Sequence, residues 1–145
     1  MTPTTLTPEE RAELLALADE HHLVELADAC LAAHGDPIVL VAPETGLVML
    51  QVREPVCEER FHLGEVVVTR AEVSLAGGHG WSMRMGTDRV AALAAAVCDA
   101  IADADTPLAA EVHELCLRTR ETTLAAATSE WAELRPTEVE FEELD

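Results

Sequence analysis

The spacing of hydrophobic residues changes near residue 37, and this change separates a helical segment from a segment of strands. Thr7-Pro8-Glu9-Glu10 is typical of a helix start, because it combines a capping residue, a first-turn proline and a capping-box glutamate. Residues at helical spacing predict a second helix that contains Leu23, Leu26, Ala27, Cys30 and Leu31. We expect that helix to end at Gly35-Asp36-Pro37, since proline cannot continue a helix. The first six residues are expected to be loose.

After Pro37 the apolar residues alternate with a period of two, which predicts strands. Residues 38–42 and 47–53 are expected to form a hairpin around the turn Pro43-Glu44-Thr45-Gly46. In the segment 61–75, one face carries Val67, Thr69, Ala71, Val73 and Leu75. After the turn Gly77-Gly78, alternate positions hold His79, Trp81, Met83 and Met85. Short turns between consecutive strands favour an antiparallel sheet of about four strands with one face covered.

The last third of the chain returns to helical spacing. Thr87-Asp88 is expected to cap a helix, and Thr106-Pro107 is expected to open another that continues toward Trp131. The apolar stripe of the first of these consists of Val90, Leu93, Ala94, Val97 and Ile101. Residues 136–145 form an acidic tail in which Val139, Phe141 and Leu144 favour docking. The pattern predicts one α+β domain, residues 1–145, with the sheet flanked by N-terminal and C-terminal helices.

Composition narrows the function classes. The chain has 145 residues, 49% of them hydrophobic, which is enough for one ordinary core. Its 28 acidic and 9 basic residues give a net charge of −19, and every basic residue is Arg. A surface this negative repels phosphate backbones, so nucleic acid is not an expected partner. The absence of Lys excludes Schiff-base chemistry and a P-loop.

The cysteines and the apolar runs bear on the compartment. Four cysteines are widely spaced without a CxxC pair: Cys30, Cys57, Cys98 and Cys116. With no signal peptide recognised, we expect reduced thiols in a cytoplasmic protein. The apolar runs are shorter than the roughly 20 residues that a membrane helix needs, so no membrane partner is expected.

Candidate chemistry concentrates on the segment 58–72 but forms no recognisable catalytic set. One hypothesis is a stand-alone enzyme that uses His62, Glu65 and Arg70, yet acid–base catalysis needs a partner and a pocket that spacing does not supply. The alternating charges are Glu58, Glu59, Arg60, Glu65, Arg70 and Glu72. Such alternation is typical of a solvated or interface strand with cross-strand ion pairs. An acidic binding module is a further alternative. His113 and Cys116 lack the remaining ligands of a metal site, and neither catalytic nor metal residues are predicted.

Four motifs between Ala42 and Ala104 carry a resemblance to a known family. They are Glu44-Thr45-Gly46-Leu47-Val48, Glu59-Arg60-Phe61 with Gly64-Glu65, Thr69-Arg70-Ala71, and Gly80-Trp81 leading through Gly86 and Asp88 into an alanine-rich helix. In this order and spacing the chain resembles PhnG, a subunit family of the bacterial carbon–phosphorus lyase core complex. The match is good over about half of the chain and looser elsewhere.

The resemblance implies an accessory or structural subunit. Its partners in that complex would be PhnI, against which it packs, with PhnH, PhnJ, PhnL and possibly PhnK. ATP would be a substrate of the complex: an alkylphosphonate attacks the ribose carbon, adenine leaves, and a ribose 1-phosphonate 5-triphosphate forms. The resemblance assigns this displacement to PhnI, and assigns the radical carbon–phosphorus cleavage, with its iron–sulfur cluster and S-adenosylmethionine, to PhnJ. No cofactor is implied on this chain.

The motif residues are candidates for an interface. The full set is Glu44, Thr45, Gly46, Arg60, Phe61, Gly64, Glu65, Thr69, Arg70, Gly80, Trp81, Gly86 and Asp88. Gly64 is expected to mark a bulge where a strand begins, and Glu65 and Arg70 are expected to be polar anchors. Arg60, Arg70 and Arg84 are candidates for binding partner carboxylates, because the guanidinium offers a planar fork.

Overall fold

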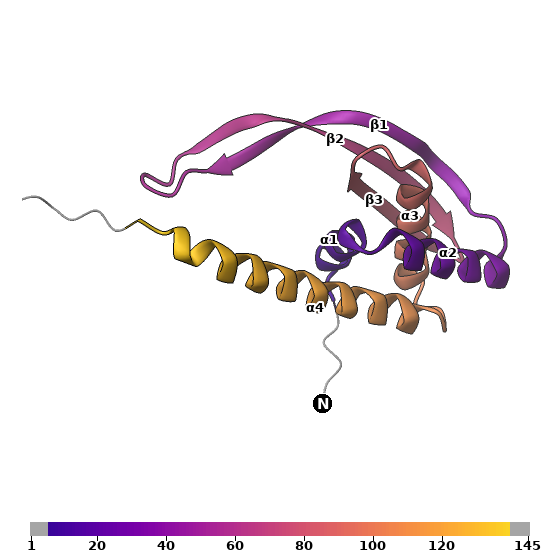
Figure 1. Ribbon diagram of the computed structural model, residues 1–145. Helices are drawn as coiled ribbons and strands as arrows, with labels where there is room; N and C mark the ends of the chain where they lie inside the picture. The colour runs from indigo at the N-terminus through magenta and orange to yellow at the C-terminus, as the bar shows by residue number, and fades with distance from the viewer. Residues whose placement is uncertain (1–5, 140–145) are drawn as a thin grey trace, which may run out of the picture.

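The computed structural model describes residues 6–139, which form four α-helices, a 3-10 turn and a three-stranded antiparallel sheet. The helices lie on one side of the sheet, below it in the view of Figure 1. The elements in chain order are α1 (Pro8–Leu17), α2 (Glu20–His34), β1 (Ile38–Arg53), β2 (Arg60–Leu75), β3 (Gly78–Met85), α3 (Arg89–Asp103), α4 (Ala109–Leu134) and η1 (Arg135–Thr137). The predicted α+β class is confirmed. The predictions for residues 1–5 and for Phe141 and Leu144 lie outside the described residues, whereas Leu6, expected to be loose, is buried.

The first two helices form where local sequence signals place them. At the start of α1, Thr7 Oγ1 accepts a hydrogen bond from the Glu10 backbone at 3.2 Å, and Glu10 Oε2 accepts one from the Thr7 backbone at 2.9 Å. This reciprocal pair is the predicted capping box. Gly35, with φ of 83°, ends α2 as expected.

The hairpin predicted around Pro43-Glu44-Thr45-Gly46 is wrong, and so is the count of about four strands. These residues lie inside the single 16-residue strand β1, which pairs with β2 over almost its whole length. The connecting turn spans residues 54–59 instead. β1 is an edge strand in the order β1-β2-β3, where a proline without an N–H is tolerated. Long-range pairing therefore overrides local turn chemistry.

The sheet covers α3 with small residues. On β3, Gly78, Gly80 and Ser82 are buried, whereas the larger alternate side chains lie on the opposite face. A Cβ added to Gly80 would lie 1.9 Å from the carbonyl oxygen of Ala96 in α3. The close approach needs glycine on the strand and small residues on the helix, and α3 supplies buried alanines. Val90, predicted on the apolar stripe of this helix, is 64% exposed.

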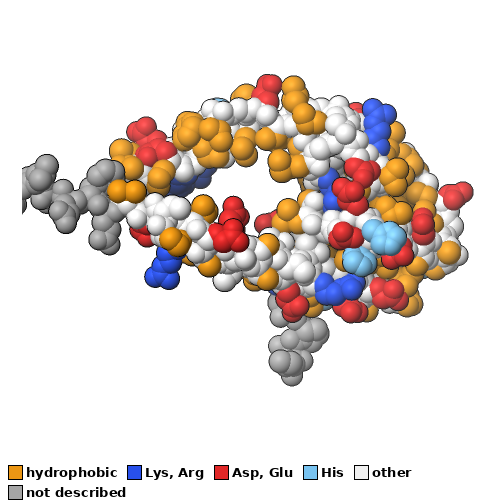
Figure 2. Space-filling model, viewed as in Figure 1, with side chains coloured by type: hydrophobic (Ala, Val, Ile, Leu, Met, Phe, Trp, Pro, Cys, Tyr) orange, Lys and Arg blue, Asp and Glu red, His pale blue; other side chains and the backbone are white. Residues whose placement is uncertain are grey.

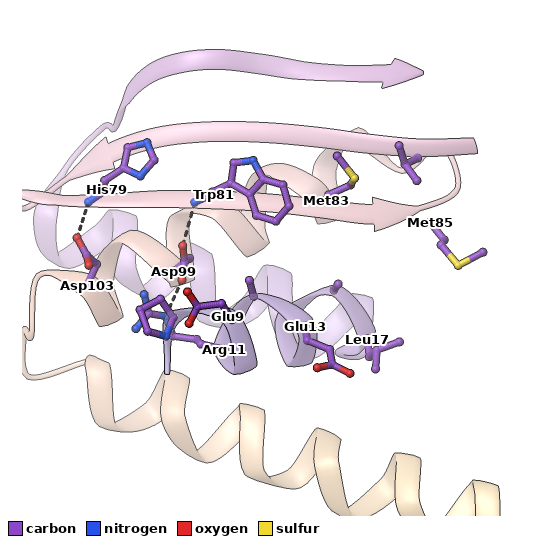
Figure 3. Close-up of a pocket in the computed structure, with 14 residues that line it drawn as sticks. Glu9, Arg11, Glu13, Leu17, His79, Trp81, Met83, Met85, Asp99 and Asp103 are labelled. Atoms are coloured by element: carbon purple, nitrogen blue, oxygen red, sulfur yellow. Dashed lines mark hydrogen bonds and ion pairs between the residues drawn. The ribbon is translucent and has the colours of Figure 1, made fainter. Parts of the chain in front are cut away.

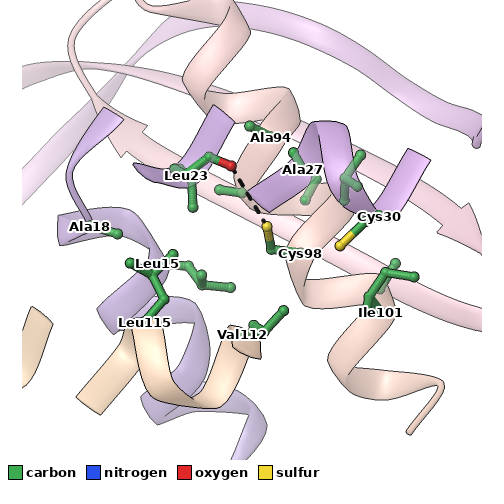
Figure 4. Packing of buried hydrophobic residues seen from close by; sticks show 14 of the residues in the cluster. Leu15, Ala18, Leu23, Ala27, Cys30, Ala94, Cys98, Ile101, Val112 and Leu115 are labelled. Atoms are coloured by element: carbon green, nitrogen blue, oxygen red, sulfur yellow. Dashed lines mark hydrogen bonds between the residues drawn. The ribbon is translucent and has the colours of Figure 1, made fainter. Parts of the chain in front are cut away.

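The core lies where α3 packs against β2 and the other helices (Figure 4). Its largest fully buried side chains include Leu15, Leu23, Val73, Val97, Ile101 and Val112. Only the first turns of α4 take part, because the buried residues of this helix end at Thr119. The remaining residues of α4, like the outer part of the β1–β2 hairpin, extend beyond the core (Figure 1).

Candidate protein-binding surfaces

Two family motifs, distant in sequence, meet at the base of the long hairpin. Glu44 lies opposite Arg70 and Thr45 opposite Thr69 in the β1–β2 register. Arg70 Nη2 is 2.8 Å from Glu44 Oε1, which makes the predicted kind of cross-strand ion pair. Thr69 Oγ1 donates to the Gly86 carbonyl at 2.8 Å, so Thr45 is the donor in the 3.0 Å bond between the two threonines. These contacts fix how the hairpin leaves the domain.

Beyond this base the hairpin forms an arm, defined as residues 47–67, in which the motif residues Phe61, Gly64 and Glu65 are exposed. Arg60 lies at the first position of β2, next to the turn at the tip of the arm, and is exposed as well. The register shifts between Leu50 and Gln51, so one extra β2 residue lies beside Gly64, as expected for a bulge. The interface role of Arg60, Phe61 and Glu65 stays a prediction.

The other motif residues have structural roles around α3. Gly86 turns the chain with φ of 95°, and Asp88 caps α3 through a 2.9 Å bond to a first-turn N–H. Gly46, in β1, lies opposite Val68 of β2. Arg84, proposed to bind partner carboxylates, is instead buried: its guanidinium donates to the carbonyls of Leu15 and Ala18 at the end of α1. This burial lowers the pKa of Arg84 from its ordinary value.

The structure does not bring His62, Glu65 and Arg70 together. All three lie on β2, and the last is eight positions beyond the first. At about 3.3 Å per residue this is roughly 26 Å along a strand. Arg70 pairs with Glu44, and both His62 and Glu65 are exposed on the arm. The geometry needed for acid–base catalysis by this set is therefore absent from the described part of the chain.

The outer half of α4 carries an apolar stripe that the sequence analysis did not single out. Residues 121–134 are all exposed, and Leu124, Ala127, Trp131 and Leu134 recur at intervals of three and four residues. Trp131 is 65% exposed and Leu124 is 62% exposed. Such spacing places the side chains on one side of a helix, where they normally face a packing partner. The stripe could have been found from this spacing alone.

The arm and the outer half of α4 run alongside an open space (Figures 1 and 2). Alternation places Leu47 and Val67 on the same sheet face as Thr69 and Ala71, which is the face that covers α3. Beyond the end of the core, the apolar side chains on this face of the arm do not pack against another element of the described chain. Leu47 and Met49 are each 61% exposed. Figure 2 shows hydrophobic side chains along the arm at this opening. Exposed apolar surfaces of this extent are typical of protein-binding sites.

The buried cysteines belong to the core. All four thiols are free, and Cys30, Cys98 and Cys116 are buried. Burial raises the pKa of Cys116 to about 11, while the contact with Cys30, together with burial, raises that of Cys98.

Between residues 6 and 139 no group of three or more His, Cys, Asp or Glu side chains is placed to hold a metal ion. In the same range no helix is long and apolar enough to cross a membrane.

The fold and these surfaces define the class of the protein. It is a small α+β domain with two exposed apolar surfaces, one on the arm and one on α4, and such surfaces are typical of protein-binding subunits. A family model described as phosphonate metabolism protein PhnG matches residues 8–144. The chain belongs to the PhnG family. It is also 38% identical over 95 residues to the alpha-D-ribose 1-methylphosphonate 5-triphosphate synthase subunit PhnG of Rhizobium meliloti (strain 1021). That alignment covers 63% of this chain and 61% of the relative, which is less than two thirds of the relative's length.

Proposed function

We propose that this chain is an accessory subunit of a carbon–phosphorus lyase core complex in organic phosphonate catabolism. With PhnH, PhnI and PhnL it would support the formation of alpha-D-ribose 1-alkylphosphonate 5-triphosphate from ATP and an alkylphosphonate, with release of adenine. Family membership and the name of the Rhizobium relative support this pathway. The observation that carries the subunit role is the pair of exposed apolar surfaces on the arm and on α4.

The charge of the chain favours a different protein as the occupant of these surfaces. Two copies of this chain would each bring a net charge of −19 to a shared interface, and like charges oppose association. A partner with a basic rim around an apolar centre would match both the stripe on α4 and the surrounding carboxylates. We propose PhnI as this partner, with PhnJ and PhnH in the same core, and PhnL and possibly PhnK joining the assembly.

The acidic surface also supports a structural role during the reaction. The triphosphate of ATP and the phosphonate are both anions, and no lysine is available to hold them. Arg84 is buried and bound to carbonyls, and Arg70 pairs with Glu44. Arg60, the third candidate arginine, is exposed at the tip of the arm, where a partner chain would meet it. We propose that the partner chains hold the anionic substrates, and that ATP is a substrate of the complex without a site on this subunit.

The test is reconstitution with purified PhnI, PhnH and PhnL, measuring adenine release from ATP and methylphosphonate with and without this chain. Omission should abolish adenine release. If the chain does not associate with PhnI on coexpression, or if release continues without it, the proposal is wrong.

A matched pair of variants locates the contact. Leu47→Asp on the arm should prevent association with the partner subunits, because it places a charge in an apolar interface. Val90→Asp is the control, since Val90 is equally apolar and 64% exposed but lies at the start of α3. Equal loss of association in both variants would count against the arm as the contact.

A further inference from the structure

A groove of about 860 Å³ lies between α1 and the outer face of β3 (Figure 3). Its floor is formed by Trp81, Met83 and Met85, which alternate along β3 on the face opposite α3. α1 forms the other wall. The groove adjoins the motif contacts at the base of the arm, since Met83 lies opposite Arg70 in the β2–β3 register. Of the motif residues, only Trp81 lines the groove itself.

α1 has a second apolar side that the core does not use. Leu14 and Leu15 are buried in the core, whereas Ala12, Ala16 and Leu17 line the groove. Leu17 is 54% exposed, and Met85 on the opposite wall is 76% exposed. A helix that packs on one side only would be expected to carry polar residues on the other. The groove therefore has apolar residues on both walls, and no segment from the described part of the chain fills it.

Carboxylates surround this apolar surface. Glu9 and Glu13 project from α1 and Asp103 from α3, and all three residues are exposed. The only arginine that lines the groove, Arg11, is already held by Asp99, with Nε 2.5 Å from Oδ1. The rim is therefore negative, which disfavours nucleotides and acidic segments and favours a ligand with positive charge.

The backbone of β3 decides how a ligand could bind. The N–H of His79 donates to Asp103 Oδ2 and the N–H of Trp81 donates to Asp99 Oδ2, each at 2.9 Å (Figure 3). These N–H groups point away from β2 and would otherwise be free to pair with an added strand. Because they are occupied, a partner cannot extend the sheet along this part of β3. Recognition must depend on side chains.

We propose that this groove binds an amphipathic segment of another protein, which places a large aliphatic side chain against Trp81 and Met83 and an Arg or Lys beside Glu13. The apolar walls and the negative rim together select this chemistry, since neither a purely apolar nor a purely basic segment satisfies both. The proposal goes beyond the subunit role above, because the groove is distinct from the exposed apolar side chains of the arm and of α4, and because it is tested on the full chain alone.

The probe is a blocked synthetic peptide in which leucine and arginine alternate, compared with a serine–arginine peptide of equal charge. Binding is measured at about 0.15 M salt, where the Debye length is about 8 Å, so that the overall charge contributes little. Trp131→Phe leaves Trp81 as the single tryptophan, and its emission then reports occupation of the groove. The leucine–arginine peptide should bind and change this emission, and the serine–arginine peptide should bind about tenfold more weakly.

Two variants, one that changes the charge of the rim and one that fills the groove, test whether the peptide binds in the groove. Glu13→Lys reverses a rim charge and should weaken binding by about tenfold. Asp28→Lys makes the same change of net charge at an exposed position of α2 and should leave binding unchanged. Ala16→Phe fills the groove without changing its charge and should also weaken binding. Equal binding of both peptides, equal weakening by Glu13→Lys and Asp28→Lys, or unchanged Trp81 emission would each overturn the proposal. None of these outcomes depends on association with PhnI.

Discussion

Truncation of Trp131 separates the contribution of α4 to binding from its contribution to folding. Trp131 is 65% exposed, so a partner that covered it fully would bury roughly 100–160 Å² of its surface, given the 150–250 Å² that an aromatic side chain can bury. At about 25 cal/mol per Å², this corresponds to about 2.5–4 kcal/mol. Trp131→Ala should then weaken binding of the partner subunits by roughly 50- to 1000-fold.

The folded chain should tolerate the same change. Trp131 is not part of the hydrophobic core, and alanine is a better helix former than tryptophan. The free energy of unfolding should therefore change by less than about 0.5 kcal/mol. Calorimetric titration against purified PhnI, alone and with PhnH and PhnJ, measures the first effect, and thermal unfolding measures the second. Ser129→Ala, an exposed and uncharged position of α4 off the apolar stripe, is the control and should leave the dissociation constant unchanged. A dissociation constant that does not change would refute the assignment of α4 as a contact surface.

Two further predictions concern the core. Gly80→Ala should destabilise the chain by about 1–3 kcal/mol and lower Tm by about 3–10 °C, because the new Cβ would meet the backbone of α3. Gly46→Ala is the control: a Cβ at Gly46 would have no atom within 4 Å, so Tm should not change. Burial raises the pKa of Cys116 to about 11, so its thiol stays protonated in the folded state while the unfolded thiol ionises near pH 8.5. The contribution of Cys116 to stability is therefore complete below about pH 8.5 and lost as the pH rises toward 11, by up to about 1.4 kcal/mol per pH unit. Cys116→Ala should flatten this part of the pH profile in denaturant unfolding, and an equally steep profile in the variant would contradict the assignment.

The sequence predicted those elements whose signals are local. The capping box at Thr7 and the glycine end of α2 depend on neighbours within a few residues, and both are confirmed. The segment Pro43–Gly46 was misassigned because its turn chemistry is local, whereas its actual partner is Thr69-Arg70 across the sheet. No local signal distinguishes a proline in a turn from a proline on an edge strand.

The surfaces were predictable only in part. The alternation on β2 correctly predicts the buried face from Thr69 to Leu75, but Val67 on that face is 41% exposed and Val68 on the other face is buried. Of the charged strand positions, Arg70 forms a cross-strand ion pair with Glu44. The groove could not be predicted, because it depends on how α1 lies beside β3, some seventy residues later in the chain. The sequence predicts that the guanidinium of Arg84 is available to a partner carboxylate. In the structure it is buried and donates hydrogen bonds to carbonyl groups of α1, whose position next to β3 no local signal reveals.

The register shifts in β1 bear on how the free chain avoids self-association. The outer edge of β1 is unpaired within the described residues, and an uninterrupted edge of this length would be a template for stacking copies of the chain. Shifts between Val39 and Val41, between Val41 and Glu44, and between Leu50 and Gln51 divide this edge into short segments of differing twist. Pro43 removes a further donor. A flat, continuous fibril-like ladder is thereby disfavoured, and the apolar arm can persist in solution until a shape-matched surface covers it.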